Sequence, residues 1–203
     1  MKFYDKFHPD GYYHLFNHAV GFDNLFRSHD NYLFFLARYE KYIYPVAKTF
    51  VYCLMPNHFH FLIQIRNEES IRQLAKVDQS VEFDFHRFMM QYLSNFLNSY
   101  AKAFNKQHKR KGALFIDFTK RIEIKNETYF NRIIHYIHLN PVHHGFVASV
   151  NDWKYSSYHS IIDPQGALKL EREAILEWFG GIAAFVEFHQ TALLLEATYE
   201  IEC

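Results

Sequence analysis

The sequence predicts an α+β fold, and three observations support this prediction. Residues 49–65 contain two short apolar runs rich in Val, Phe, Tyr and Ile, which are separated by Met55, Pro56 and Asn57. Residues of these types favour strands, whereas Pro56 cannot donate to a ladder and Asn57 tolerates turn geometry, so a β-hairpin is expected. Residues 12–20 alternate as a further strand. Helical spacing of apolar residues recurs in three longer stretches, 30–44, 81–106 and 129–140.

Shorter segments connect these elements. Pro45 is expected to end the first helix, and the polar residues 68–80 contain a short helix. The long helix opens at its basic end into residues 106–112, and a hairpin-like pair of strands is expected over residues 113–125.

Three helices are expected in the last third of the chain. Asn126 or Thr128 caps the helix over residues 129–140, and Pro141 is expected to end it. Two further amphipathic helices are expected over residues 168–179 and 182–189.

Composition favours one domain with a small appendage. The chain has 203 residues, 19% of them aromatic, with only 7 Gly and 5 Pro, so little of it is expected to be linker. Cys53 in an apolar strand and Cys203 at the last position do not suggest a disulfide framework, which fits a reducing cytoplasm. No signal-peptide core and no apolar run near the roughly 18 residues of a spanning helix occur. A cytoplasmic protein that does not enter membranes is therefore expected.

Two histidines on the second strand of the hairpin are candidates for a metal site or a polar active-site floor. Period-two alternation places His58 and His60 on one face, together with Leu62 and Gln64. Imidazoles at this spacing can form half of a metal site. The chain has 14 His, so one such pair is also expected by chance, and a purely structural pair is the alternative.

The first strand carries two further histidines. His14, Phe16 and His18 share one face, opposite Tyr13, Leu15 and Asn17. His14 and His18 could therefore contribute to the same polar floor. Decoration of an edge strand is the simpler interpretation.

A basic patch is the one electrostatic feature, because Lys plus Arg and Asp plus Glu are balanced at 22 each. Nucleic-acid binding would then need local cations rather than net charge. The candidates are Lys106, Lys109, Arg110, Lys111, Lys120 and Arg121. A solvated helix end is the alternative interpretation of this charge run.

Tyr136 and Asn140 form a column along the edge of the last long helix. They are four residues apart and therefore lie on the same side, with Tyr129 on the same edge. Such edge residues can pack and still reach a cleft. A tyrosine at this border is otherwise an ordinary amphipathic core residue.

Four motifs occur in order along the chain. They are Met55-Pro-Asn-His58-Phe-His60-Phe-Leu-Ile, Lys111-Gly-Ala-Leu-Phe with Phe118-Thr-Lys-Arg, Tyr136-Ile-His-Leu-Asn140-Pro-Val with Gly145-Phe-Val, and Asp152-Trp-Lys-Tyr-Ser-Ser-Tyr-His159. In this order and with these separations, they resemble the signature of the single-tyrosine transposases of the insertion-sequence 200 type. Within that family the chain resembles the branch associated with repetitive extragenic palindromes (REP). The resemblance covers residues 1–160 and leaves residues 161–203 as a C-terminal helical extension.

The resemblance implies a fold and a set of site residues. The implied fold is an antiparallel sheet backed by helices in a ferredoxin-like or RNA-recognition-like arrangement, commonly a homodimer. His58 and His60 would be metal ligands for Mg²⁺ or Mn²⁺, with Asn140 as the third ligand and Tyr136 as the nucleophile. Many relatives carry Gln at the position of Asn140, so Asn140 matches the family's third ligand by its role and not by its residue type.

The resemblance also implies a reaction, which is metal-dependent cleavage and transfer of single-stranded or hairpin DNA. Tyr136 would form a covalent 5′-phosphotyrosine and release a 3′-hydroxyl, while the basic patch would contact phosphates. Two alternatives from other classes stay open. One is a binder of structured nucleic acid that does not cut it. The other is a metal-dependent phosphodiesterase in which water is the nucleophile.

Overall fold

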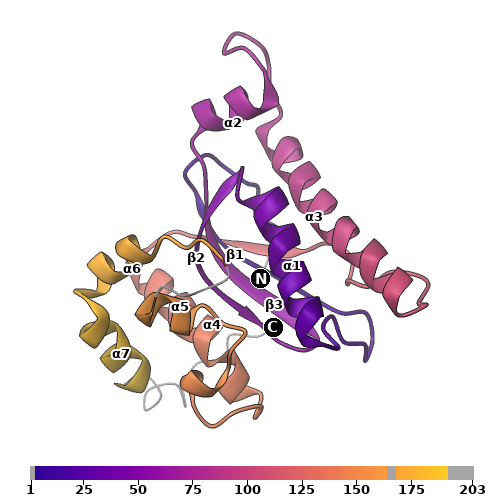
Figure 1. The fold of residues 1–203 in the computed structure, drawn as a ribbon. Helices are drawn as coiled ribbons and strands as arrows, with labels where there is room; N and C mark the ends of the chain where they lie inside the picture. Colours follow the sequence, from indigo (N-terminus) through magenta and orange to yellow (C-terminus); the bar gives the residue numbers. More distant parts are fainter. Residues whose placement is uncertain (1–2, 164–167, 192–203) are drawn as a thin grey trace.

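The computed structural model describes residues 3–163 and 168–191, which form a four-stranded antiparallel sheet between two layers of helices (Figure 1). The strands are β1 (Tyr12–His18), β2 (Ala47–Leu54), β3 (His58–Ile65) and β4 (Lys120–Ile124). Their spatial order is β2-β3-β1-β4, and every neighbouring pair is antiparallel. With helices between β1 and β2 and between β3 and β4, this order is the ferredoxin-like arrangement, so the predicted α+β fold class is confirmed.

Seven α-helices and one short 3₁₀ helix surround the sheet in the described part of the chain. The helices are α1 (His29–Ile43), α2 (Glu68–Ala75), α3 (Phe85–Gln107), α4 (Glu127–His143), α5 (Tyr158–Ile162), α6 (Arg172–Phe179) and α7 (Ile182–Thr191), and the 3₁₀ helix is Val150–Asp152. The predicted extension therefore contains the two expected helices. Its residues 192–203, Cys203 among them, lie outside the described residues.

The predicted hairpin is confirmed. Strands β2 and β3 meet at Pro56 and Asn57, where the Met55 N–H donates to the His58 carbonyl at 2.8 Å. Proline has no N–H to donate and fits this position, which needs no donor from it. The short turn fixes the register of β3, and the register decides which of its side chains face α4.

One face of the sheet packs against α1 and α3. Phe61 of β3 is fully buried and stacks on Tyr39 of α1, with ring centroids 4.1 Å apart. Phe35 and Phe96 complete the contact from α1 and α3. The apolar stripes that predicted these helices are therefore the surfaces that bury this face.

The opposite face packs against α4, which α5, α6 and α7 cover in turn (Figure 1). Leu62 of β3 and Ile133 and Ile137 of α4 share one buried cluster. Ile175 of α6 and Phe185 of α7 belong to the same cluster and are fully buried. The C-terminal helices thus complete the core around α4.

A buried polar chain also ties α7 and β2 to α4. His189 Nδ1 lies 2.8 Å from the Phe185 carbonyl and therefore donates to it, which leaves His189 Nε2 to accept from His138 Nδ1 at 2.8 Å. His138 Nε2 then accepts from the Ser157 hydroxyl at 2.8 Å, and Ser157 Oγ accepts from the Tyr52 N–H of β2. Burial holds the pKa of His138 well below its ordinary value, so His138 is neutral.

Two expected boundaries are wrong. Pro141 does not end α4: its fixed φ is compatible with helix, so α4 continues to His143 at the cost of the one N–H that would have bonded the Ile137 carbonyl, and the His144 N–H donates to the Asn140 carbonyl. Residues 113–119 form no hairpin with the strand that follows. They run beside the end of β1, while β4 pairs with β1 itself, and Phe118 has a positive φ of 62° that interrupts any regular strand.

Among the described residues, no helix combines the length and the apolar character that crossing a membrane requires.

Phe61→Ala should lower the free energy of unfolding by about 3–5 kcal/mol, because it removes a fully buried ring from a packed aromatic cluster. Phe61→Leu should cost less, since it leaves a smaller cavity. Urea titration followed by circular dichroism measures both. The matched control is Leu74→Ala on α2, where the side chain is 39% exposed and a change within about 0.5 kcal/mol is expected. A loss under about 1 kcal/mol for Phe61→Ala would contradict this packing.

Candidate active site

Two histidines of β3 lie on the face of the sheet that α4 covers. His58 and His60 are two residues apart, so both side chains project from the same side of the strand. They are 2% and 0% exposed, and their rings meet edge to face with centroids 5.1 Å apart. Polar groups buried this deeply need partners within the protein.

Helix α4 supplies those partners. Asn140 Oδ1 lies 2.8 Å from His58 Nε2, and Asn140 Nδ2 lies 3.4 Å from His60 Nε2. One turn earlier, the ring of Tyr136 lies edge-on to the His60 ring, with centroids 5.4 Å apart. The structure therefore brings together the four residues that the sequence singled out. Their chemical roles stay predictions.

His14 is a further member of this cluster, and its interpretation as decoration of an edge strand is wrong. Strand β1 lies between β3 and β4, so the side chain is fully buried. Its Nε2 lies 2.9 Å from His60 Nδ1. The alternation along β1 indicated the correct face, but the pairing of β1 with β3 that creates this contact could not be predicted from the alternation alone.

The hydrogen bonds determine which nitrogen of His60 carries the proton. Asn140 Nδ2 can only donate, so His60 Nε2 accepts and the proton lies on Nδ1. His60 Nδ1 then donates to His14 Nε2, which places the proton of His14 on its own Nδ1. That Nδ1 is buried and has no hydrogen-bond partner among the described residues. The lone pair of His60 Nε2 is therefore held toward Asn140.

His58 lies between two amide oxygens. Its Nδ1 is 2.8 Å from Asn57 Oδ1, and its Nε2 is 2.8 Å from Asn140 Oδ1. A neutral imidazole has one N–H and can satisfy only one of these oxygens. At the other contact, two lone pairs face each other.

Burial keeps these imidazoles neutral. It lowers the pKa of His14 and the pKa of His58 to about 3. Burial also lowers the pKa of His60 well below its ordinary value, and the neighbouring His14 and His58 lower it further. At neutral pH each of these imidazoles therefore keeps one ring nitrogen with a lone pair.

Two more imidazoles border the cluster. The His18 ring stacks on the His58 ring with centroids 4.5 Å apart, and burial together with Lys120 lowers the pKa of His18. The His144 ring lies 5.1 Å from the His58 ring. Sequence reasoning missed His144, although its position four residues after Asn140 places it on the same side of α4.

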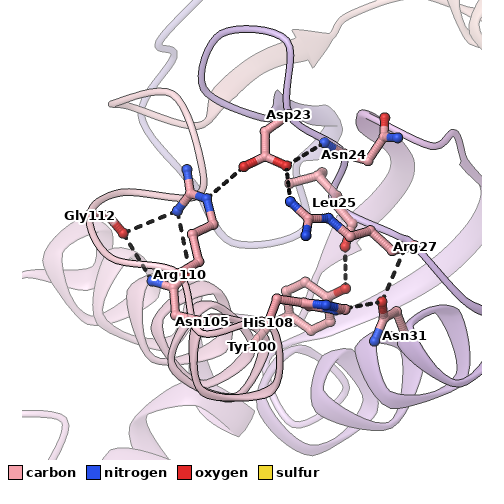
Figure 2. Close-up of polar contacts among 10 residues, drawn as sticks. All are labelled: Asp23, Asn24, Leu25, Arg27, Asn31, Tyr100, Asn105, His108, Arg110 and Gly112. Atoms are coloured by element: carbon pink, nitrogen blue, oxygen red, sulfur yellow. Dashed lines mark hydrogen bonds and ion pairs between the residues drawn. The ribbon is translucent and has the colours of Figure 1, made fainter.

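The predicted basic patch is divided by the structure. Arg110 lies 2.6 Å from Asp23 and also contacts Asn105, so it ties the end of α3 to the loop after β1 (Figure 2). Arg121 is 7% exposed and donates to the carbonyls of Asp5 and Thr119.

The four lysines of the patch differ from these two arginines. Lys106, Lys109 and Lys111 are exposed. Lys120 is half-buried on the histidine face, with its Nζ 5.3 Å from the centroid of the Phe16 ring. Phosphate contact stays a prediction for the patch, and these lysines are its accessible members.

No protein-family model matches the chain. A curated protein of Haemophilus influenzae, named as a REP-associated tyrosine transposase, is 27% identical over 119 residues, which cover 57% of this chain and 61% of that protein. The match therefore spans less than two thirds of that relative. A solved structure of a REP-associated tyrosine transposase bound to a REP hairpin covers 83% of this chain and 87% of its own, with 16% identity and a TM-score of 0.55. Both bear the family name that the motifs predicted, so the predicted resemblance is confirmed, and the structural match shows the fold.

The metal-free protein should lose stability as the pH falls below about 6.5, the ordinary histidine value. In the folded protein the pKa of His14 and the pKa of His58 are lowered to about 3. Between about pH 6.5 and that value, these two histidines are therefore protonated only in the unfolded chain. Each group should then contribute up to about 1.4 kcal/mol per pH unit in favour of unfolding. Urea titrations in EDTA at pH 7.5 and pH 5 measure the effect, and His14→Gln should make it shallower by removing one group. Equal stabilities at both pH values would contradict the buried neutral cluster.

Proposed function

We propose that this chain, like the REP-associated tyrosine transposases it resembles, processes DNA, and that it cleaves and transfers single-stranded or hairpin strands through Tyr136. The observation that carries the proposal is the convergence of Tyr136 and Asn140 on the two histidines of β3. The fold supports it, because the similar solved structure is a transposase bound to a REP hairpin. Hairpin DNA is therefore the substrate class that we infer for this chain.

The residues around Asn140 fit a divalent cation. Within the described residues, no group of three or more His, Cys, Asp or Glu could hold a metal ion, so the donors would be two imidazoles and one amide. His58 Nε2 and Asn140 Oδ1 are 2.8 Å apart, and a cation bound to both lone pairs would leave the single proton of His58 on Nδ1, where it can donate to Asn57 Oδ1. Mn²⁺ and Mg²⁺ both suit this mixture of neutral nitrogen and oxygen ligands. His58, His60 and Asn140 would hold the ion, which would supply Lewis-acid stabilisation of a phosphate oxygen.

The surroundings of Tyr136 support its proposed role as the nucleophile. Its ring lies against His60 and His14, and its side chain is 8% exposed, so little water reaches it. In the proposed step the phenolic oxygen loses its proton and bonds to phosphorus. The bond from phosphorus to the 3′ oxygen breaks, and that oxygen leaves as a hydroxyl after taking up a proton. The resulting 5′-phosphotyrosine conserves the phosphodiester energy, so rejoining needs no ATP.

His14 would orient the site without touching DNA. Its hydrogen bond keeps the His60 proton on Nδ1 and the lone pair of Nε2 toward Asn140. Partners of this kind fix the ring orientation of metal-binding histidines. His14 is thus a positioning residue in this proposal.

Wild-type protein incubated with end-labelled hairpin DNA and Mn²⁺ should yield an adduct that survives denaturation, with the label mapped by mass spectrometry to Tyr136. Tyr136→Phe removes one oxygen and keeps the ring, so it should fold and bind DNA but form no adduct. Tyr129→Phe, on the same helix, is the matched control and should retain the reaction. Cleavage without any adduct would favour the phosphodiesterase alternative, and binding without cleavage would favour the non-catalytic alternative.

Mn²⁺ should bind the DNA-free protein, and the double variant His58→Ala, His60→Ala should abolish binding because both imidazole donors are gone. His14→Phe should weaken binding by about 10- to 100-fold, since it removes the partner that orients His60. Electron paramagnetic resonance of free Mn²⁺ measures both effects without relying on activity. His14→Gln, which can still hydrogen bond to His60, should recover part of the affinity. Undiminished Mn²⁺ binding by the double variant would exclude the proposed ligands.

A further inference from the structure

Several large apolar side chains are exposed at the end of the sheet that carries His58. Phe22 is 110% exposed and Phe118 is 76% exposed, which are the two largest values among the exposed large hydrophobic residues described. Val20 and Ile116, each two residues before one of these phenylalanines, are 40% and 48% exposed. We call these four residues the apolar strip. Large apolar side chains exposed on neighbouring segments often mark an interaction site.

The strip belongs to two segments that run side by side. The Val20 N–H donates to the Leu114 carbonyl at 3.0 Å, and Ala19 pairs with Phe115 in an antiparallel bridge. Ala19 and Phe115 pack against the core beneath α1 and α3. The adjacent Val20 and Ile116 therefore face away from that core, toward the side of the sheet that carries His18.

The segment that presents Phe22 is held in place. The Asp23 carboxylate accepts from Arg27 at 2.7 Å and from Arg110 at 2.6 Å, as well as from the Asn24 N–H (Figure 2). Nearby, the Tyr100 hydroxyl donates to the Leu25 carbonyl. The loop is thus fastened to α3 on one side of Phe22, so its ring projects from an anchored segment.

Phe118 is presented in a different way. Its φ of 62° lies in the left-handed region, which a bulky side chain rarely adopts. The next residue, Thr119, is buried and accepts a hydrogen bond from Asn17 Nδ2 at 2.9 Å. This contact anchors the backbone while the ring of Phe118 points to solvent and meets Tyr4 edge-on, with centroids 6.2 Å apart.

The strip begins beside the candidate active site. The Ala19 N–H donates to the Asn57 carbonyl at 2.7 Å, and the Ile116 N–H donates to the His18 carbonyl at 2.9 Å. The His18 ring in turn stacks on His58. A chain molecule bound at the histidines therefore meets the strip as it leaves the site.

The charges around the strip favour a polyanion. Lys109 and Lys111 are exposed and precede Ile116, and Lys120 follows Phe118. Asp117 is the one acidic residue between positions 106 and 120. Aromatic rings interleaved with lysines are the combination that binds unpaired nucleotides, because bases stack on the rings while phosphates contact the cations.

We propose that Phe22 and Phe118 are stacking platforms for unpaired bases of the DNA strand that enters or leaves the active site. The inference rests on the proposed function and adds to it the residues that hold the single strand. A second copy of this chain would also bury apolar rings. A second copy would not require the flanking lysines, whereas the phosphates of DNA would contact them. We therefore infer that DNA is the occupant.

The test measures fluorescence anisotropy of a labelled single-stranded oligonucleotide of mixed sequence, with all variants built on Tyr136→Phe so that binding is separated from reaction. Phe118→Ala and Phe22→Ala should each weaken binding by roughly 5- to 100-fold, the effect of losing one stacked base. Phe118→Leu should be as weak as Phe118→Ala, whereas Phe118→Trp should bind at least as tightly as the parent. Leu74→Ala, another exposed apolar side chain on the distant α2, is the matched control and should change nothing.

Two further measurements separate stacking from other roles. An oligonucleotide of abasic sites should bind the parent and the Phe variants equally. The Phe variants should keep the salt dependence of the parent, while Lys111→Ala should reduce the slope of log affinity against log salt by about 0.7.

Unchanged affinity in Phe22→Ala and Phe118→Ala would overturn the inference, as would full binding by Phe118→Leu. If Phe22→Ala and Phe118→Ala abolish self-association in sedimentation experiments and leave DNA binding unchanged, the apolar strip binds a second copy of the chain. That result would also overturn the inference. If the wild type forms the Tyr136 adduct and the Phe variants bind DNA normally, only this inference fails. If the parent binds no DNA and the wild type forms no adduct, the proposed function fails with it.

Discussion

The contact of Asn140 with His58 and His60 is the interaction on which the rest of the candidate site depends. One amide side chain of α4 contacts both histidines of β3, and all three side chains are at most 2% exposed. Buried polar groups that lose such partners destabilise a protein by about 1–3 kcal/mol each. The need of these buried groups for hydrogen-bond partners fixes both the rotation and the axial position of α4 on the sheet. Because Tyr136 lies one turn earlier on the same helix, its position beside His60 is fixed as well.

The other side of α4 shows why the C-terminal helices belong to this arrangement. His138 connects the helix to Ser157 and to His189 of α7, while Phe185 and Ile175 close the apolar core around it. α4 is therefore held by neutral imidazole contacts on two sides. Neutrality matters in both places, because a charge buried here would lack the solvation that water gives it. Residues 168–191 thus support the position of the helix that carries the candidate nucleophile.

Local patterns predicted much of this structure. The hairpin turn at Pro56 and Asn57, the alternation of β3 and the spacing of Tyr136 and Asn140 depend on neighbouring residues, so each could be predicted from the sequence. The family resemblance supplied the ferredoxin-like arrangement, which the alternation itself does not contain. The contact of His14 with His60 could not be predicted, because it joins residues 46 positions apart through the register of two strands. The internal partners of Arg110 and Arg121 were missed for the same reason, since a charge run does not reveal where each side chain finds its acceptor.

The hydrogen bonds imply that His60 is neutral, with its proton on Nδ1 and its Nε2 lone pair facing Asn140. This protonation state can be observed directly. Long-range ¹H–¹⁵N correlation spectra of the histidine side chains, recorded on metal-free protein near neutral pH, distinguish the two tautomers and the charged form. We expect the Nδ1–H tautomer for His60 and a change of this signal in His14→Phe. A protonated Nε2 or a charged ring for His60 would contradict this expectation, because the nitrogen that faces Asn140 could then serve neither as an acceptor nor as a ligand.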